Sequence, residues 1–165
     1  MSVPSGWMAA DVMANGSKFR FVNTHLQSTI PGLPQAEQVQ RAQADELLAN
    51  LLFTSIPVVL AGDLNSNAEP GPEYTGTAQH VANAGFVDAW KFAHPADRGY
   101  TWPLFGEDQS GGPVMANERI DLIFVGGPLQ FWLGHTPAIV SAVRTGTTAP
   151  FASDHAGLAV KLELN

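Results

Sequence analysis

Alternating apolar and polar positions near the N-terminus predict a β-hairpin. Two apolar-rich segments, Trp7–Ala14 and Lys18–Thr24, flank an Asn15-Gly16 pair. Asn-Gly supplies the two positive φ values that a type I′ turn requires, so we expect the chain to reverse here. Both faces of the second strand carry apolar side chains over Phe19–Val22, and we therefore expect this strand to be largely buried.

Helical periodicity follows in two segments. Gln35–Phe53 predicts a helix, because its apolar residues recur at i, i+3, i+4, i+7 and i+8 on one face. This apolar face consists of Ala44, Leu47, Leu48, Leu51 and Leu52. Arg41 and Asp45 are expected to pair across one helical turn on the outer surface. Glu73–Ala84 predicts a second helix that ends at Gly85.

Continuous apolar runs predict buried strands. Ile56–Ala61 is typical of a central strand covered on both faces, and Ile120–Val125 has the same character. Three further apolar segments are Phe86–Trp90, Ala138–Arg144 and Leu158–Leu164. Pro95–Asn117 is rich in Gly, Pro and polar residues and predicts a long loop, a feature that is often functional in compact domains.

Composition agrees with one packed domain and excludes several classes of protein. The 165 residues are 45% hydrophobic and 14% charged, which excludes intrinsic disorder. The absence of cysteine excludes disulfides, thiolate metal sites and cysteine nucleophiles. No apolar stretch approaches the ~20 residues of a membrane-spanning helix. A net charge of −7 provides no broad positive field for a polyanion, so any contact with nucleic acid would be local or metal-mediated.

Polar residues with catalytic potential lie at the ends of four apolar segments. These residues are Asn23, His25, Asp63, Asn65, Asp121, Asp154 and His155. Strand ends are where a sheet brings together side chains from distant positions in the sequence, so we expect these residues to converge on one site.

Each of these residues also has a purely structural explanation. His25 alone could be a surface histidine, and Asp121 could form a local ion pair with Arg119. Asp and Asn after a strand often form turns, which could account for Asp63, Asn65 and Asp154. None of these explanations accounts for two imidazoles and three carboxylates that all border apolar runs. The other histidines lack this context and are expected to be structural: His80, His94 and His135.

Four motifs carry a family resemblance. They are Asn23-Thr24-His25-Leu26, Gly62-Asp63-Leu64-Asn65-Ser66, Arg119-Ile120-Asp121-Leu122-Ile123 and Ser153-Asp154-His155. In this order they resemble the endonuclease/exonuclease/phosphatase superfamily, which includes deoxyribonucleases, apurinic-site endonucleases, sphingomyelinases and inositol polyphosphate phosphatases. The resemblance implies an α+β fold, namely the C-terminal part of a four-layer α/β/β/α sandwich with mixed, largely antiparallel sheets.

The resemblance also implies a reaction, the hydrolysis of a phosphoester, and it favours a phosphodiester over a monoester as the substrate. A divalent cation with oxygen ligands, Mg²⁺ or Mn²⁺, would offset the negative charge that builds up on the phosphoryl oxygens. By the same resemblance, His155 is the general base or electrostatic partner of the phosphate, and Asp121 orients its ring. Asp63 orients the attacking water, and Asn65 donates to a phosphoryl oxygen.

Three more residues acquire roles from the family. His25 is expected to bind phosphate or to assist protonation of the leaving group, Asn23 to bind phosphate, and Asp154 to contribute to the metal site. The family's first strand normally ends in Asn and is followed by a metal-binding Glu. Neither has a counterpart here, because Glu37 and Glu46 lie on a helix between the motifs. We therefore expect residues 1–165 to form a single, partial domain without the family's N-terminal portion.

Two alternatives to an active enzyme remain. The chain could be a non-catalytic β-sandwich module that binds a ligand or partner through Thr101, Trp102 and Phe105 in the long loop. It could also be an inactive, truncated fragment. The sequence leaves open whether the substrate is nucleic acid, phospholipid or inositol phosphate, and it predicts no protein partner and no particular compartment.

Overall fold

A five-stranded mixed sheet organises the protein. The computed structural model describes residues 6–30, 32–71, 74–104, 116–127, 138–146 and 152–163. The strands, in chain order, are β1 (Trp7–Ala14), β2 (Ser17–His25), β3 (Val58–Asp63), β4 (Phe86–Asp88) and β5 (Asp121–Gly126). In the sheet they follow the order β1-β2-β3-β5-β4. β2 and β3 run parallel, and the other neighbouring pairs are antiparallel, so the predicted mixed and largely antiparallel sheet is confirmed.

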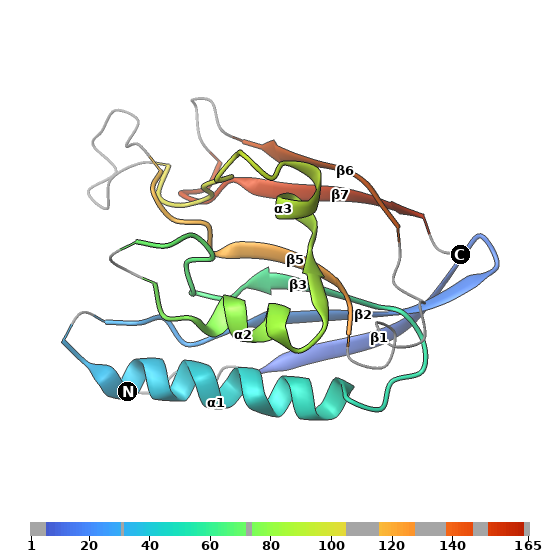
Figure 1. The fold of residues 1–165 in the computed structure, drawn as a ribbon, viewed down its shortest axis with the longest axis horizontal. Helices are drawn as coiled ribbons and strands as arrows, with labels where there is room; N and C mark the ends of the chain where they lie inside the picture. The colour runs from blue at the N-terminus through green and yellow to red at the C-terminus, as the bar shows by residue number, and fades with distance from the viewer. Residues whose placement is uncertain are drawn as a thin grey trace.

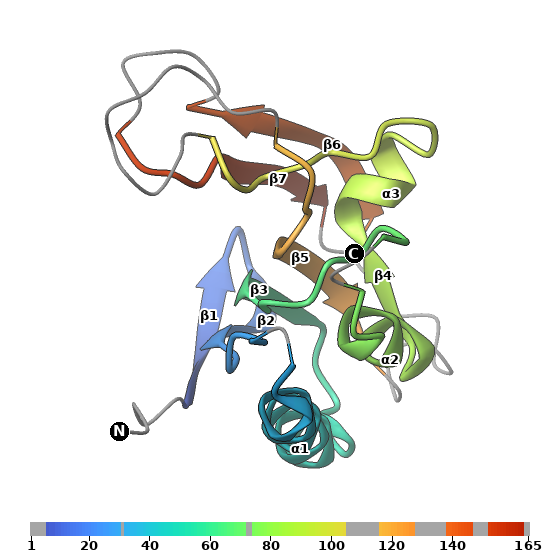
Figure 2. The same cartoon turned by 90° about the vertical axis from the view of Figure 1, so that its left-hand side faces the viewer.

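The remaining elements cover both faces of this sheet. They are α1 (Pro34–Leu51), α2 (Thr77–Asn83), α3 (Ala89–Ala93) and an antiparallel pair formed by β6 (Ala138–Thr145) and β7 (Gly157–Glu163). Figures 1 and 2 show α1 and α2 against one face, with β6, β7 and α3 on the other side. Within the described ranges, no helix is both long and apolar enough to cross a membrane.

The β1–β2 hairpin forms as predicted, but it is less buried than expected. Asn15 and Gly16 take φ values of 50° and 85° at the turn. Val22 and Thr24 are buried, whereas Phe21 on the opposite face is 39% exposed. The second sheet packs against β5 through β7. The expectation that β2 is largely buried is therefore wrong.

Helix α1 connects the parallel strands β2 and β3 and shields one face of them from solvent. Its buried stripe includes the predicted Leu47, Leu48 and Leu51, which pack in one core with residues of β2, β3 and β5. Leu52, the residue that follows the helix, is 45% exposed instead. The expected pair of Arg41 and Asp45 is present at 3.7 Å.

The two shorter helices differ from the sequence-based expectation. α2 begins at Thr77, later than predicted, because Gly76 adopts a left-handed conformation with φ 76° immediately before it. It ends before Gly85, which has φ 95° as expected of a helix terminator. Phe86–Trp90 divides at Asp88, whose carboxylate accepts the N–H groups of Trp90 and Lys91 and thereby begins α3, a helix that the apolar pattern did not reveal.

Candidate active site at one edge of the sheet

Strand direction explains why residues far apart in sequence meet at one edge of the sheet. β2 and β3 run parallel and end together, while the antiparallel β5 begins at that same edge. The register places His25 opposite Asp63 and Asp63 opposite Asp121. Three of the candidate residues therefore lie side by side on neighbouring strands, on the same face of the sheet.

His155 joins this row from the segment that precedes β7. Its Nδ1 lies 2.9 Å from Oδ2 of Asp121. A carboxylate can only accept, so Nδ1 carries the proton and Nε2 is left as the basic nitrogen of the neutral ring. Burial opposes protonation of the ring, but the hydrogen bond to Asp121 and the surrounding acidic charges outweigh it and raise the pKa of His155.

Asp63 lies at the centre of the row. One of its oxygens, Oδ2, is 3.5 Å from Nε2 of His25, and the other accepts the backbone N–H of Asn65 at 2.8 Å. Burial raises the pKa of Asp63, and the nearby charge of Asp121 adds to this, while the Asn65 hydrogen bond opposes it. Asn65 has φ 47°. The turn interpretation of Asp63 and Asn65 is thus correct, and the turn is itself part of the cluster.

Two predicted site residues lie outside this row and the adjoining Asn65 turn. Asn23 precedes His25 by two positions and donates its carboxamide to the backbone oxygen of Ala61 at 3.0 Å. Asp154 accepts the indole N–H of Trp102 at 3.2 Å. The phosphate-binding role of Asn23 and the metal-binding role of Asp154 stay predictions.

The row has the composition of a cation site. Among the described residues, Asp63, Asp121 and His155 each offer one ligand atom, and these atoms lie within 4.8 Å of one another. Burial is the main cause of the raised pKa of Asp63, and repulsion from the neighbouring carboxylate of Asp121 adds to it; a divalent cation would relieve that repulsion. Carboxylate oxygens are also the ligands that Mg²⁺ and Mn²⁺ prefer. The residues present therefore fit such a metal.

Thr101 is a site residue to which the sequence suggested a different role. Its side chain is 1% exposed, and its hydroxyl accepts the N–H groups of Ile120 and Asp121 at 3.3 and 3.2 Å. Its backbone oxygen accepts the N–H of Ala156 at 2.8 Å. Thr101 therefore links the segments that carry Asp121 and His155. A role as a surface contact is wrong for this buried residue, and Phe105 lies outside the described residues.

Gln40 is a second residue that sequence reasoning missed. It is fully buried in α1 and donates to the backbone oxygens of Gln27 and Asn65 at 2.9 and 2.6 Å. It thereby holds the ends of the β2 and β3 segments together beneath the row. The available signal was its spacing, because Gln40 lies four residues before Ala44 on the apolar stripe of α1.

The remaining polar residues behave structurally. His80 pairs with Asp45 at 2.6 Å, and His94 contacts the backbone oxygen of Ala142 at 2.7 Å, in line with expectation. His135 lies outside the described residues. The predicted pair of Arg119 and Asp121 is wrong, because the Arg119 guanidinium points away from this edge and binds other acids.

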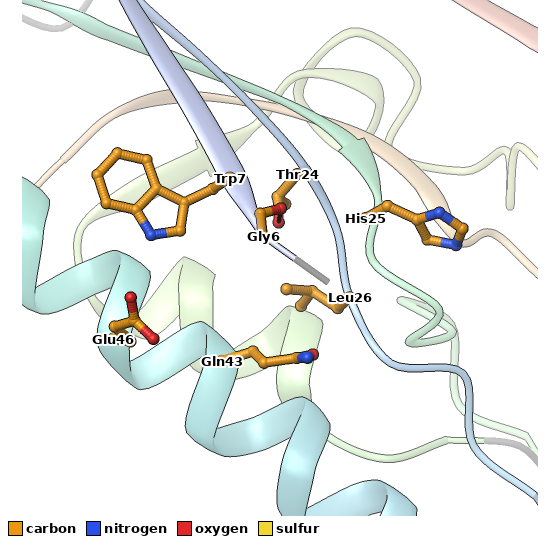
Figure 3. A pocket seen from close by; sticks show the side chains of 7 residues that line it. All are labelled: Gly6, Trp7, Thr24, His25, Leu26, Gln43 and Glu46. Carbon is orange, nitrogen blue, oxygen red and sulfur yellow. Dashed lines mark hydrogen bonds between the residues drawn. The ribbon is translucent and has the colours of Figure 1, made fainter. Parts of the chain in front are cut away.

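A cavity of about 270 Å³ lies on the opposite face of β2, between the sheet and α1. Trp7, His25, Leu26, Gln43 and Glu46 are among the residues that line it, and the His25 ring points away from the other side chains (Figure 3). The cavity therefore reaches the end of β2 that carries His25 of the row.

Most of the chain matches the model of a known protein family. The model of the Endonuclease/Exonuclease/phosphatase family matches residues 5–155. No curated protein sequence matches the chain.

Solved structures share the fold at low sequence identity. D. rerio TDP2 complexed with single-strand DNA product is 20% identical with a TM-score of 0.71, over 95% of this chain and 61% of that one. An endonuclease/exonuclease/phosphatase from Beutenbergia cavernae is 22% identical with a TM-score of 0.68, over 100% and 41%. An AP endonuclease from Archaeoglobus fulgidus is 18% identical with a TM-score of 0.67, over 94% and 65%. The chain thus spans less than two thirds of each of these proteins and has their α/β sandwich fold.

Proposed function

The chain belongs to the endonuclease/exonuclease/phosphatase family, and from this premise we propose that it takes part in metal-assisted hydrolysis of a phosphodiester by water. The observation that carries the proposal is the hydrogen bond between His155 and Asp121, directly beside the carboxylate of Asp63. An oriented imidazole next to a second carboxylate can remove a proton from a water molecule and hold that water in place.

In this mechanism the basic nitrogen of His155 is Nε2, which takes the proton from water. Asp121 keeps the opposite nitrogen protonated and stabilises the imidazolium that forms. Asp63, half-buried on the neighbouring strand, accepts a hydrogen bond from the attacking water and so orients it.

Phosphate recognition is assigned to amide and imidazole groups. The carboxamide of Asn65 donates one N–H to the backbone oxygen of Leu26, which fixes its direction and leaves a second N–H for a phosphoryl oxygen. The side chain of His25 is 74% exposed, so it can reach the phosphate or protonate the leaving oxygen. Asn23 lies on the same face and would contact the phosphate farther from the reaction centre.

A divalent cation, Mg²⁺ or Mn²⁺, would stabilise the negative charge of the phosphoryl oxygens in the transition state. Asp63 and Asp121 are the side chains best arranged to hold it, because their carboxylates are neighbours across β3 and β5. Asp154 is proposed as a further ligand from its family motif, with the Trp102 indole fixing one of its oxygens.

Metal dependence provides the direct test of this function. We expect hydrolysis of bis(p-nitrophenyl) phosphate in the presence of Mg²⁺ or Mn²⁺, and loss of at least about 99% of the rate in excess EDTA, with recovery on adding metal back. The measurement uses the folded chain, verified by circular dichroism. Absence of turnover in folded protein, or turnover that EDTA leaves unchanged, would contradict the proposal.

The pH dependence of the reaction is expected to follow His155. Its pKa is raised above the ordinary value of 6.5, and a general base works only in its neutral form. The rate should therefore increase with pH through a midpoint above 6.5. Asp121→Asn removes a group that raises this pKa and should move the midpoint to lower pH, in addition to reducing kcat. A pH–rate profile with the same midpoint in both proteins would contradict the assignment.

Nucleic acid is the polymeric substrate that we propose, because the structurally similar TDP2 was solved with a DNA product. The chain's Lys and Arg number eight, and most of them are already held by acids. The paired cations are Lys18, Arg20, Arg41, Lys91 and Arg119. A strand would therefore be bound mainly at the reacting phosphate rather than along its backbone.

Salt dependence tests this local mode of binding. With about one phosphate contact, KM for a single-stranded oligonucleotide should rise roughly threefold or less between about 50 and 200 mM salt. Phospholipid vesicles and bis(p-nitrophenyl) phosphate serve as alternative substrates in the same assay. A loss approaching the ~10³-fold of proteins with many phosphate contacts would contradict local binding.

A further inference from the structure

Arg119 is a buried cation two residues before Asp121, and it forms two ion pairs in different directions. Its side chain is 1% exposed. Nη1 lies 2.7 Å from Oδ2 of Asp88, and Nη2 lies 3.1 Å from Oε1 of Glu69. Asp88 is the last residue of β4, and Glu69 belongs to the loop after β3, so one planar guanidinium connects three segments of the chain.

The backbone around Arg119 is bonded to the same loop. Its N–H donates to the side-chain oxygen of Asn67 at 3.1 Å, and its carbonyl accepts the N–H of Ala68 at 3.0 Å. One residue later, the carbonyl of Ile120 accepts the N–H of Leu64 at 2.9 Å. The loop that begins with the Asp63 turn and contains Asn65 is therefore bonded along its length to the residues that lead into Asp121.

We propose that Arg119 is a positioning residue of the reaction: by bridging Glu69 and Asp88 it fixes the loop after β3 against the start of β5. That contact sets the distance between Asp63 and Asn65 on one side and Asp121 and His155 on the other. The proposal rests on the function proposed above for these four residues. Arg119 itself touches none of the reacting groups.

A guanidinium is suited to this role in a way that an ammonium is not. Its donors diverge in a fixed plane, so it can bind the carboxylates of Glu69 and Asp88 at the same time and fix their separation. A lysine keeps the positive charge but presents a single flexible point charge. Arg119→Lys therefore keeps a positive charge beside Glu69 and Asp88, but it removes the bridge between their two carboxylates.

The test compares Arg119→Lys with a matched control on the same acid. Lys91→Met removes the partly exposed cation that also pairs with Glu69 at 2.9 Å, and it leaves the Arg119 bridge in place. We expect Arg119→Lys to lower kcat between about 10- and 100-fold with KM changed by roughly twofold or less, because small misplacements of reacting groups are costly in rate. Lys91→Met should leave kcat within about twofold of the parent protein.

A second readout does not depend on activity. The proton on Nδ1 of His155, hydrogen-bonded to Asp121, gives a downfield proton NMR signal. We expect this signal in the parent protein and in Lys91→Met, and we expect it to shift or broaden in Arg119→Lys. Parent-like kcat together with a parent-like signal in folded Arg119→Lys would overturn the proposal.

Two further outcomes are decisive as well. If Arg119→Lys does not fold, Glu69→Gln keeps the shape of the side chain and weakens the same bridge. A fall in its kcat at constant KM then supports the proposal, and an unchanged kcat overturns it.

If the parent protein hydrolyses no phosphodiester, the proposed function fails, whereas the NMR comparison still shows whether Arg119 positions Asp121 and His155.

Discussion

Replacing His155 with alanine is expected to lower kcat for phosphodiester hydrolysis by about 10³-fold while leaving the protein folded. A positioned general base contributes about 10²–10⁴-fold, and His155 is the residue whose Nε2 is left basic by its contact with Asp121. Its side chain is 28% exposed, so its removal opens no sealed cavity. The loss of one hydrogen bond costs only about 1 kcal/mol of stability.

The matched control is His80→Ala. His80 also pairs with a carboxylate, Asp45, but the pair joins α1 and α2 away from the sheet edge. The measurement is the steady-state rate on bis(p-nitrophenyl) phosphate with Mg²⁺, together with thermal melting of both variants. Parent-like turnover in His155→Ala, or an equal loss in His80→Ala, would contradict the role assigned to His155.

The row of site residues could be predicted because it depends on strand ends and strand direction. Apolar segments that end just before His25 and Asp63, and one that begins at Ile120 beside Asp121, specify three strand ends from sequence alone. What the sequence left open was their pairing. Only the observed order, with β3 between β2 and β5, brings these three residues into register.

The residues that hold this row in place were harder to predict, because their partners are distant in sequence. Gln40 and Thr101 bond backbone groups 25 and 20 positions away. Arg119 is followed two residues later by Asp121, which suggested a local ion pair, yet its buried guanidinium binds Glu69 and Asp88. In each case the polar partner is chosen by tertiary packing, which no local pattern encodes.

The role of Gly62, the motif glycine before Asp63, could not be predicted from the sequence either, since it depends on how closely two strands approach. Gly62 has φ 157°, and it pairs with Thr24 on the parallel strand β2. A Cβ on this residue would lie 1.9 Å from the backbone oxygen of Thr24. That atom belongs to the strand that presents His25, so it cannot move away without disturbing the site.

Gly62→Ala is therefore expected to be the most destabilising single substitution proposed for this chain. Overpacking costs about 1–3 kcal/mol and unfavourable backbone conformation about 1–2 kcal/mol more, which together remove a large part of the ~5–15 kcal/mol that stabilises a typical domain. If the variant folds at all, β2 must be displaced from β3, so the contact between His25 and Asp63 should be lost with it. Chemical denaturation and the rate on the diester measure the two effects.

Alanine substitutions at two other glycines distinguish the steric overlap from the unfavourable backbone conformation. Gly6→Ala adds a Cβ in open space and should leave stability unchanged, while Gly16→Ala tests positive φ alone, because Gly16 has φ +85° with nothing within 4 Å. The latter should cost about 1 kcal/mol, the ordinary penalty for a left-handed alanine. A loss in Gly62→Ala no larger than that in Gly16→Ala would mean that β2 and β3 tolerate a side chain between them. The close approach of the two strands would then not be what requires glycine before Asp63.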